Sequence, residues 1–224
     1  MDHPSFAKAL TELGLDLTPL QSEQFDLFEE RLYQWNEVMN LTRVSRDECW
    51  LRHFVDSLLI QDLVPWKASV LDVGTGPGFP AWPLACARPD LQVTAIDSSG
   101  KMIGFLNRNP LPNLKTLQVR AEEWKMRERF GVVTGRAVAP LGIQLEISAP
   151  VAVKGGLVIA MRTPSERELC QSDVSQLGLK LAEIYERRLP GTDIVRLFPV
   201  YAKTASTPDR YPRTWAEMKR EPLI

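Results

Sequence analysis

The sequence predicts an α/β fold: a largely parallel β-sheet with helices on both faces, preceded by a helical segment. Two observations support this prediction. Before residue 66, apolar side chains recur at the spacing of amphipathic helices. From residue 69 onward, short apolar runs alternate with segments of helical character. Alternating strands and helices form βαβ units, which place helices on both faces of a parallel sheet.

Residues 1–66 are predicted to form an N-terminal helical extension. The letters TPLQ at 18–21 form a capping box with Pro19 at the first helical position. Five apolar residues then predict a buried helix face: Phe25, Phe28, Leu32, Trp35 and Met39. A second capping box, SRDE at 45–48, predicts another helix with a second apolar set: Leu51, Phe54, Val55, Leu58 and Leu59.

Residues 67–224 are predicted to form the sheet domain, with a basic C-terminal tail. Five apolar runs predict parallel strands, and they read SVLDVG, LQVTAID, LKTLQV, FGVVTG and GLVIAMR. Segments at 80–88, 99–108 and 141–150 supply helices between the strands. After Gly178, LKLAEIYERRL and DIVRLFPVYAKT flank the turn letters PGTD, which predicts an antiparallel hairpin at the sheet edge.

Composition excludes several classes of protein. The chain has 224 residues, 44% hydrophobic and 25% charged, and no apolar run approaches the length needed to span a bilayer, so no membrane partner is expected. The N-terminus MDHPSFAKAL lacks the pattern of a signal peptide. Cys49, Cys86 and Cys170 share no C-x-x-C spacing, so neither a disulfide framework nor a metal site is expected. These features favour a cytoplasmic location.

The charge of the chain is small overall but uneven. A net charge of −1 does not by itself indicate a nucleic-acid-binding protein. Residues 187–224, however, hold eight basic and four acidic side chains. Such a tail can contact phosphates or can be a solvated terminal segment, and charge alone leaves both interpretations open.

Three alternating glycines, Gly74, Gly76 and Gly78, stand directly after the first predicted strand. Glycine lets the chain turn sharply and lets a ligand approach the backbone closely. Asp97 ends the second predicted strand, where a carboxylate can accept both hydroxyls of a ribose. Because ligands of such sheets bind at the carboxyl ends of the strands, these residues predict a site for an adenosine-containing ligand.

Two kinds of adenosine ligand compete for such a turn. A dinucleotide needs the third glycine of G-x-G-x-x-G, but Phe79 holds that position and Pro80 follows it. Asp72, just before the loop, would repel a pyrophosphate but suits a cation. S-adenosylmethionine carries an ammonium and a sulfonium group, so an acid followed by three alternating glycines favours this cofactor. The alternative is a tight turn that binds no ligand.

Longer motifs resemble the RsmG (GidB) family, bacterial methyltransferases of small-subunit ribosomal RNA. They are WNEVMNLTRV (35–44), RHFVDSLL (52–59), LDVGTGPGFP (71–80), AIDSSGKMIGFL (95–106), RAEEW (120–124), GRAVAPL (135–141) and RYPRTWAEMKREPL (210–223). The first two are more specific than the glycine loop, which many methyltransferases share. The resemblance implies the class I methyltransferase fold, with a Rossmann-like, mostly parallel seven-stranded sheet. It also implies methylation of N7 of a guanine in a loop of 16S ribosomal RNA, with S-adenosylmethionine as the cofactor.

The resemblance also implies contacts to the cofactor. These are Gly74, Phe79, Asp97, Ser98, Ser99, Ala121, Glu122 and Arg136, and the residues themselves add Asp72, Gly76 and Gly78. Arg136 follows the fourth predicted strand, which makes it a candidate beside the methyl transfer. Two positions depart from the family pattern: Gly131 replaces an acid on the fourth strand, and Arg162 replaces the lysine that often ends the fifth.

The chemistry that the resemblance implies requires no general base. N7 of guanine has a free lone pair, so the protein mainly needs to align donor and acceptor and to exclude water. No residue is therefore predicted with certainty to be catalytic. Methylation of C5 of cytosine would need a cysteine nucleophile in a suggestive motif. The letters NPLP at 109–112 come too early, and lack the aromatic residue, for the motif common in methylation of exocyclic amines.

Polar residues of the helical extension have two possible roles. His53, Asp56 and Ser57 either dock the extension on the sheet or help to read RNA, and Asn40 is either a cap or a substrate contact. Several cations are candidates for RNA phosphate contacts: Arg43, Arg46, Arg52, Arg136, Arg162, Arg210, Arg213, Lys219 and Arg220.

Two alternatives to an RNA methyltransferase remain open at this level. The acceptor could be a small molecule or a protein, although the basic tail and the N-terminal motif pair speak against this. The chain could also be a non-catalytic RNA- or ribosome-binding protein with a vestigial cofactor site. The form of the RNA substrate and the oligomeric state are not determined by the sequence, although a monomer is favoured.

Overall fold

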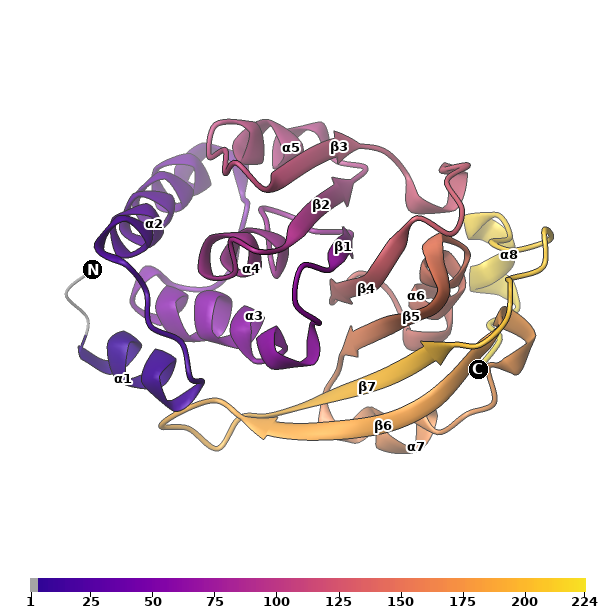
Figure 1. The fold of residues 1–224 in the computed structure, drawn as a ribbon. Coiled ribbons are helices and arrows are strands. Elements are labelled where there is room, and N and C mark those ends of the chain that lie inside the picture. Colours follow the sequence, from indigo (N-terminus) through magenta and orange to yellow (C-terminus); the bar gives the residue numbers. More distant parts are fainter. Residues whose placement is uncertain (1–3) are drawn as a thin grey trace.

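The computed structural model of the chain describes residues 4–224; residues 1–3, the start of the predicted N-terminal extension, lie outside the described part. A seven-stranded sheet in the order β3-β2-β1-β4-β5-β7-β6 forms its centre (Figure 1). The strands are β1 Ser69–Val73, β2 Gln92–Asp97, β3 Leu114–Gln118, β4 Phe130–Arg136, β5 Ala152–Met161, β6 Leu179–Arg188 and β7 Val195–Lys203. The mostly parallel seven-stranded sheet is confirmed.

The five parallel strands come first in the chain and the antiparallel pair comes last. β1 pairs in parallel with β2 and β4, β2 with β3, and β4 with β5. β7 runs antiparallel to β5 and to β6, in a register from Leu179 opposite Lys203 to Arg188 opposite Val195. The predicted hairpin at the sheet edge is confirmed, with β6 as the edge strand.

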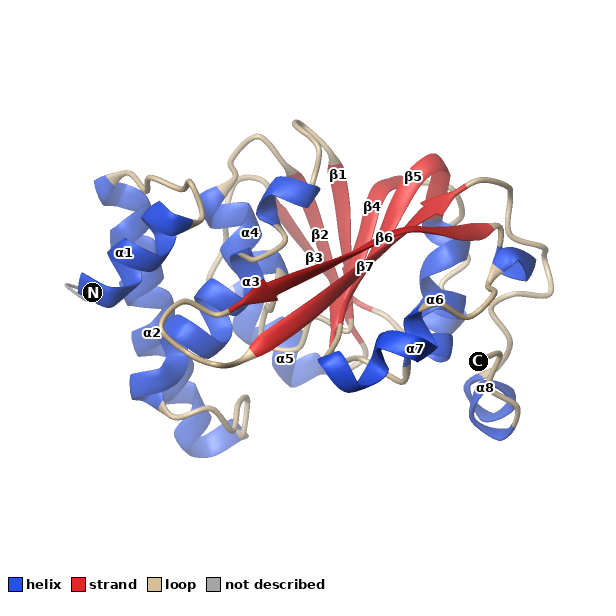
Figure 2. Ribbon diagram, turned by 90° about the horizontal axis from the view of Figure 1, so that it is seen from below, coloured by secondary structure: helices blue, strands red, loops and turns tan. Residues whose placement is uncertain are grey.

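Helices cover both faces of the sheet, as the alternation of strands and helices predicts. In Figure 2, α1 to α5 lie on one side of the strands and α6 to α8 on the other. The α-helices are α1 Pro4–Glu12, α2 Pro19–Met39, α3 Asp56–Leu58, α4 Ala81–Ala87, α5 Gly100–Asn107, α6 Leu141–Ser148, α7 Arg167–Cys170 and α8 Trp215–Arg220.

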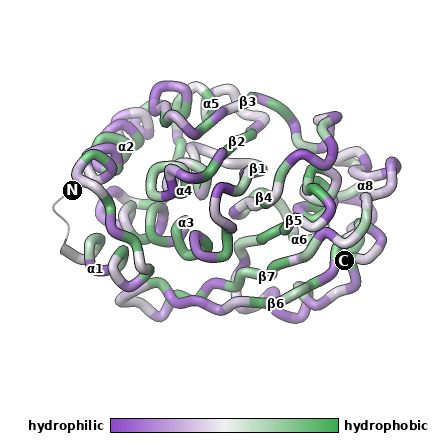
Figure 3. Tube along the Cα trace, in the orientation of Figure 1, coloured by the Kyte–Doolittle hydropathy of each residue, from purple (hydrophilic) through white to green (hydrophobic). Residues whose placement is uncertain are grey.

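Two hydrophobic clusters form because side chains alternate between the two faces of each strand. Val70 and Val132 join the cluster under α1 to α5. Their neighbours Leu71 and Val133 join the cluster under α6 and α7. Both faces of the central strands are therefore buried, which explains why these strands are almost continuously apolar. Figure 3 shows this pattern, with hydrophobic residues on the central strands and hydrophilic ones mainly at the periphery.

The predicted start and buried face of α2 are confirmed. The Thr18 hydroxyl accepts from Gln21 N, the Gln21 side chain accepts from Thr18 N, and Pro19 is the first helical residue. Phe28 is buried and stacks on Trp82 of α4, with ring centroids 4.1 Å apart. Burying an aromatic side chain of this kind contributes about 2–3 kcal/mol. The same cluster joins α1 and α2 to the sheet, so the extension and the sheet share one core.

The second predicted capping box does not form. The Ser45 hydroxyl donates to the Glu48 carboxylate (3.2 Å) and caps no backbone N–H group. The Glu48 carboxylate also pairs with Arg52 (3.2 Å). Instead of one regular helix, the chain forms a 3₁₀ turn at Arg46–Glu48, a π-helical segment at Trp50–Val55 and then α3. π-Helical turns are rare and frequently occur at functional sites.

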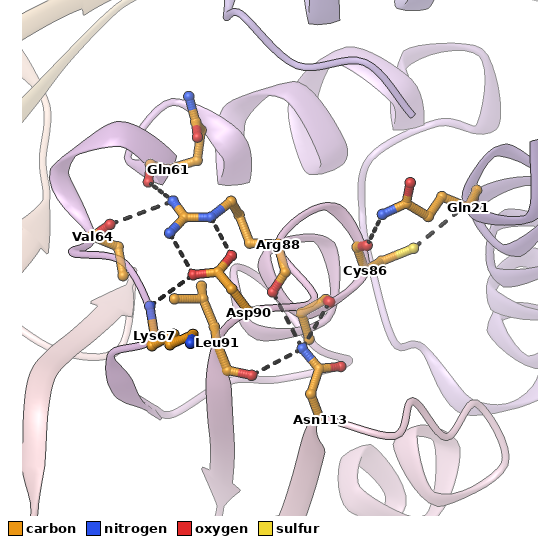
Figure 4. A network of polar contacts seen from close by, with 10 residues as sticks. Gln21, Gln61, Val64, Lys67, Cys86, Arg88, Asp90, Leu91 and Asn113 are labelled. Atoms are coloured by element: carbon orange, nitrogen blue, oxygen red, sulfur yellow. Dashed lines mark hydrogen bonds and ion pairs between the residues drawn. The ribbon is translucent and has the colours of Figure 1, made fainter. Parts of the chain in front are cut away.

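Polar contacts also tie the extension to the sheet, at the end away from the glycine loop (Figure 4). Arg88 donates to the carbonyl of Gln61 (2.6 Å) and pairs with Asp90 (2.7 Å). The Asp90 carboxylate accepts from the backbone N–H of Lys67 (2.9 Å). The contact between Arg88 and Gln61 crosses the predicted boundary between residues 66 and 67, and the division into two units there stays a prediction.

Candidate functional site

The strand order reverses between β1 and β4, and the carboxyl ends of these strands meet at one edge of the sheet. Ligands of open α/β sheets bind at such a switch point. A cavity of about 340 Å³ lies there, and we call it the strand-tip cavity. Its lining includes several residues expected to contact the cofactor, namely Gly74, Asp97, Ser98, Ala121 and Glu122, with apolar walls from Val73, Ile96, Val119, Val138 and Ile147.

The glycine loop can take its shape only with glycine at two of its positions. Gly74 has φ +64°, and a Cβ atom there would stand 2.3 Å from Cγ2 of Val138. Gly78 has φ +118°, and a Cβ atom there would stand 2.6 Å from Cδ2 of Leu106. Both the left-handed backbone and the close packing therefore exclude a side chain. This leaves the backbone of Gly74 as part of the cavity wall.

Asp97 joins the glycine loop to the next helix. One carboxylate oxygen accepts from Gly76 N (2.9 Å), and the other accepts from Ser99 N (2.8 Å), at the N-cap of α5. Each oxygen keeps a second lone pair, so the carboxylate can still accept hydroxyl groups from a ligand in the cavity. Ser99 thus lies behind Asp97, while Ser98 lies on the cavity wall.

Asp72, at the end of β1, is buried beside the glycine loop. Its side chain has no exposed surface, and one oxygen accepts from the Thr75 hydroxyl (2.6 Å) and from Ala81 N (3.0 Å). Burial raises the pKa of Asp72 from its ordinary value to about 7. Asp72 therefore holds the loop to the start of α4, and its predicted role beside the cation of the cofactor stays a prediction.

A second cavity of about 480 Å³ lies between the extension and the carboxyl ends of β4 and β5, and we call it the arginine cavity. Four arginines line it together with two acids, and the lining residues are Val44, Arg52, His53, Asp56, Arg136, Ala137, Met161, Arg162, Thr163, Glu166 and Arg196. Four cations against two acids make this cavity attractive to an anion.

Arg136 is held by the extension. Its guanidinium donates to the carbonyl of Arg52 (2.8 Å), to the Asp56 carboxylate (3.0 Å) and to Nδ1 of His53 (3.0 Å). It also lies over the ring of Phe79, with Cζ 5.2 Å from the centroid. Burial lowers the pKa of Arg136, and the neighbouring Asp56 opposes this shift. Arg136 lines the arginine cavity and not the strand-tip cavity.

His53 is neutral in this arrangement. Burial, with the nearby charges of Arg136 and Arg52, lowers the pKa of His53 to about 3. Because Arg136 donates to Nδ1, the proton of the neutral ring sits on Nε2, which donates to the Thr42 hydroxyl (2.7 Å). The imidazole lies flat on Phe79 of the glycine loop.

Asp56 docks the extension on the sheet. Its carboxylate is 2% exposed and pairs with Arg136 of β4 (3.0 Å) and Arg196 of β7 (2.9 Å). Losing either cation would leave part of a buried charge unpaired. Of the two interpretations open for the cluster of His53, Asp56 and Ser57, these contacts favour docking. Ser57 is buried, and its hydroxyl has no hydrogen-bond partner.

The two cavities share one lining residue, Ala137. A third cavity of about 260 Å³ lies over the glycine loop, lined among others by Gly74, Gly76, Phe79 and Arg136. Ala137 lines all three cavities, and Gly74 lines the strand-tip cavity and the third one. Ala137 has φ +54°, an uncommon conformation for a residue with a side chain. A group bound in the strand-tip cavity and one bound in the arginine cavity would therefore both lie beside Ala137.

The other RNA candidates of the extension have varied surroundings. Asn40 is the C-cap of α2 in the left-handed conformation, φ 49°, which supports its interpretation as a cap. Arg43 is exposed. Arg46 pairs with Glu29 (3.1 Å), whereas Arg52 reaches the arginine cavity.

Two predicted phosphate contacts bind partners within the protein. Arg162 is 6% exposed, and its guanidinium donates to the carbonyl of Ala139 (3.0 Å) and to the side chain of Gln144. Arg213 donates three hydrogen bonds to Glu146, which is 1% exposed. Both guanidinium groups thus have partners within the protein, and Arg162 also lines the arginine cavity, so a phosphate contact of either residue stays a prediction. The remaining tail candidates are exposed: Arg210, Lys219 and Arg220.

Sequence reasoning did not single out two residues that line the cavities, or one that supports them. Trp215 of the tail lines the strand-tip cavity. Arg196 of β7 lines the arginine cavity, and Thr42 holds His53. Their letters lie within or near the quoted motifs, but no spacing rule connects them to a site. Gly131 lies five residues before Arg136, roughly 16 Å away along the strand at about 3.3 Å per residue, so the missing acid there is remote from both cavities.

Within residues 4–224, no helix combines the length and apolar character that a bilayer crossing requires. In the same part of the chain, no group of three or more His, Cys, Asp or Glu residues is placed to hold a metal ion.

Fold and site together define a class I S-adenosylmethionine-dependent methyltransferase. Solved structures with a similar fold include M. jannaschii TYW2 in complex with AdoMet, at TM-score 0.52 and 16% identity over 66% of this chain and 73% of that one. Another is a SAM-dependent methyltransferase from Aquifex aeolicus, at TM-score 0.53 and 19% identity over 69% and 92% of the two chains.

Comparison with family models then specifies the family. The model described as "rRNA small subunit methyltransferase G" (GidB) matches residues 21–184, and the chain belongs to this family. Ribosomal RNA small subunit methyltransferase G of Lachnoclostridium phytofermentans is 38% identical, over 100% of this chain and 98% of the relative. The proteins of that name from Lactobacillus johnsonii and Bacillus subtilis are 35% and 34% identical, over 100% of this chain and 100% and 99% of theirs.

Proposed function

We propose that this methyltransferase transfers the methyl group of S-adenosylmethionine to N7 of a guanine in a loop of 16S ribosomal RNA. The observation that carries the proposal is that Ala137 lines both the strand-tip cavity and the arginine cavity, which places the two side by side. One cavity suits a nucleoside cofactor and the other suits a nucleotide. The family and the names of its members support ribosomal RNA as the acceptor.

The strand-tip cavity fits the cofactor by the chemistry of its walls. Asp97 can accept the ribose hydroxyls, and the backbone of Gly74 offers close approach where a side chain would collide with Val138. Ile96 and Val119 supply apolar walls for a planar base, beside Ala121 and Glu122. When bound, S-adenosylmethionine supplies an electrophilic methyl group on a positively charged sulfur.

The arginine cavity suits a guanine nucleotide that has left its stack. Arg52 and Arg196 can meet phosphate or base oxygens, and Val44 and Met161 provide apolar contact for the ring. Unstacked bases in RNA loops are the ones that proteins read most easily. Arg43 is exposed nearby in sequence and remains a phosphate contact under this proposal.

The residues around Ala137 position the methyl donor and the acceptor and exclude water. None of them needs to accept a proton. N7 of guanine attacks with its own lone pair, so the protein contributes alignment and a dry site. Arg136 is fixed by three partners of the extension, and Phe79 and His53 close the space beneath it. A neutral His53 keeps an additional positive charge away from a cofactor that is itself a cation.

The proposal places the protein in the cytoplasm as a monomer that acts on 16S ribosomal RNA or on the small ribosomal subunit. The experiment that tests it is mass mapping of 16S ribosomal RNA from cells that lack the gene. We expect one 7-methylguanosine to disappear and to return with the wild-type gene, but not with a gene encoding Asp97→Ala. An unchanged methylguanosine pattern in the deletion strain would refute the proposed acceptor.

A further inference from the structure

The C-terminal strap, residues 204–224, passes from the end of β7 to the strand-tip cavity. Arg127 holds its first part by donating to the carbonyls of Thr207 (3.2 Å) and Tyr211 (2.7 Å). The basic residues of the strap predict RNA contacts when only the sequence is considered. The structure gives the strap a different neighbour, because its helix α8 supplies a wall of the strand-tip cavity.

The strap is fastened at two points beside the cavity. Arg213 donates to the buried Glu146 through its backbone N–H (2.8 Å), Nε (2.9 Å) and Nη2 (2.8 Å). At the end of the chain, Ile224 lies against Gly142, where a Cβ atom would stand 3.1 Å from Cγ1 of Ile224. Both anchors lie on α6, whose Ile147 lines the cavity.

Trp215 stands between these anchors and lines the cavity itself. It is the first residue of α8, and a capping box of Thr214 and Glu217 fixes the start of that helix. Lys219, one turn along, lies 5.6 Å from the centre of the indole ring. Lys219 thus holds the indole from the side of α8. Among the described residues that line the cavity, Trp215 is the only aromatic one.

We propose that Trp215 is a cofactor-binding residue, which the C-terminal strap holds against the planar base of the bound nucleoside. The other walls around it, Val138 and Ile147, are aliphatic. An aromatic ring offers a base more contact area and stacking, and its removal typically weakens base binding severalfold to more than a hundredfold. The proposal rests on the assignment of the cofactor but not on that of the RNA.

Under this proposal, binding of the cofactor and docking of the strap favour each other. If the cofactor binds more tightly when the strap is docked, it must also favour the docked strap by the same factor. The strap offers a direct readout, because Arg210, Lys219 and Arg220 are exposed sites for trypsin. Cleavage there requires local opening, which a bound cofactor would oppose.

The test combines calorimetry and limited proteolysis of the full chain, with S-adenosylhomocysteine as the stable probe. We expect Trp215→Ala to raise the Kd about tenfold or more, and Trp215→Phe to restore most of the affinity. The probe should slow tryptic cleavage of the strap in the wild type and in Trp215→Phe. In Trp215→Ala, protection should be largely lost even when the probe is raised to the same fractional saturation. Glu221→Gln, an exposed residue of the strap that contacts Arg220, is the matched control and should behave as wild type.

Two outcomes would overturn the inference. One is a Trp215→Ala variant that binds the probe within twofold of the wild type. The other is a Trp215→Phe variant that binds the probe as weakly as Trp215→Ala, although both variants have the melting temperature of the wild type without the probe. An aromatic side chain would then fail to restore binding in a folded protein. A wild type that binds no probe would overturn the cofactor assignment as well. Binding of small ribosomal subunits without cofactor should be unchanged in Trp215→Ala, which separates this role from an RNA contact.

Discussion

The ring of His53 lies flat on the ring of Phe79, with centroids 4.1 Å apart and planes within 5°. This stack joins the π-helical segment of the extension to the glycine loop. The same imidazole accepts from Arg136, so one side chain contacts both the loop beside the cofactor and the arginine beside the acceptor. The position of Arg136 therefore depends on residues that precede the sheet in the chain.

His53→Ala should reduce methyl transfer without weakening cofactor binding. The variant removes an acceptor of Arg136 and the ring that packs on Phe79, but it touches no wall of the strand-tip cavity. Misplacement of a group by about 1 Å can cost about 100-fold in rate, so we expect kcat to fall roughly 10- to 100-fold. Steady-state assays on small subunits and calorimetry with S-adenosylhomocysteine measure the two effects. Equal losses in kcat and in cofactor affinity would contradict this separation.

Asp97→Ala should abolish cofactor binding at practical concentrations. It removes the carboxylate at the tip of β2 and frees Gly76 N and Ser99 N, so it affects both the ligand and the loop. We expect the Kd for S-adenosylhomocysteine to rise about 100-fold or more, because a hydrogen bond to a charged group contributes about 1.5–3 kcal/mol and the carboxylate can accept two from the ribose hydroxyls. Asp193→Asn, on the exposed hairpin turn, is the control. The prediction fails if both variants bind equally well.

The free energy of unfolding should depend on pH through two buried groups, His53 and Asp72, which act in opposite directions. The pKa of His53 is lowered by burial from 6.5 to about 3, so between these values the unfolded state binds an additional proton and the free energy of unfolding rises with pH. The pKa of Asp72 is raised by burial from 3.8 to about 7, so between these values the folded state binds an additional proton and the free energy of unfolding falls as pH rises.

Between pH 5 and 6 the two effects should largely cancel in the wild type, and single variants should reveal them. His53→Asn should leave a free energy of unfolding that falls by about 1 kcal/mol per pH unit, and Asp72→Asn one that rises by a similar amount. Urea unfolding at pH 5.0, 5.5 and 6.0 measures these slopes. Slopes of the same sign in the two variants would show that at least one burial effect is absent.

Loss of the Arg43 side chain should weaken binding to the small subunit, whereas loss of the Arg213 side chain should lower the stability of the fold. Arg43→Ala, at an exposed site, should weaken binding to small subunits and reduce the slope of log K against log salt by about one, with unchanged stability. Arg213→Ala leaves the buried Glu146 unpaired and should lower the free energy of unfolding by about 3–5 kcal/mol. Salt titrations of binding and urea unfolding distinguish the two. An Arg213→Ala variant with unchanged stability and a reduced salt slope would show that Arg213 contacts a phosphate of the RNA.

The fold and the cofactor turn were predictable because their signals lie within a few neighbouring residues. The capping box from Thr18 to Gln21 and the alternation of apolar runs and helices are local patterns. The glycine loop is similar, since its left-handed backbone strongly favours glycine. The prediction of a capping box at 45–48 was wrong because the Glu48 side chain accepts from the Ser45 hydroxyl and pairs with Arg52 instead. A local pattern does not decide between such competing partners.

The sequence by itself determined the layered sheet, the turn after β1, the acid at the tip of β2 and the family. Only the tertiary structure decided that Asp56 meets Arg196, 140 residues further along the chain, and that Asp72 and Arg213 turn inward. It also decided that Trp215 reaches the strand-tip cavity. The physical reason is that secondary structure depends on side chains a few positions apart, whereas the partner of a charge depends on which distant segments the packed core brings together.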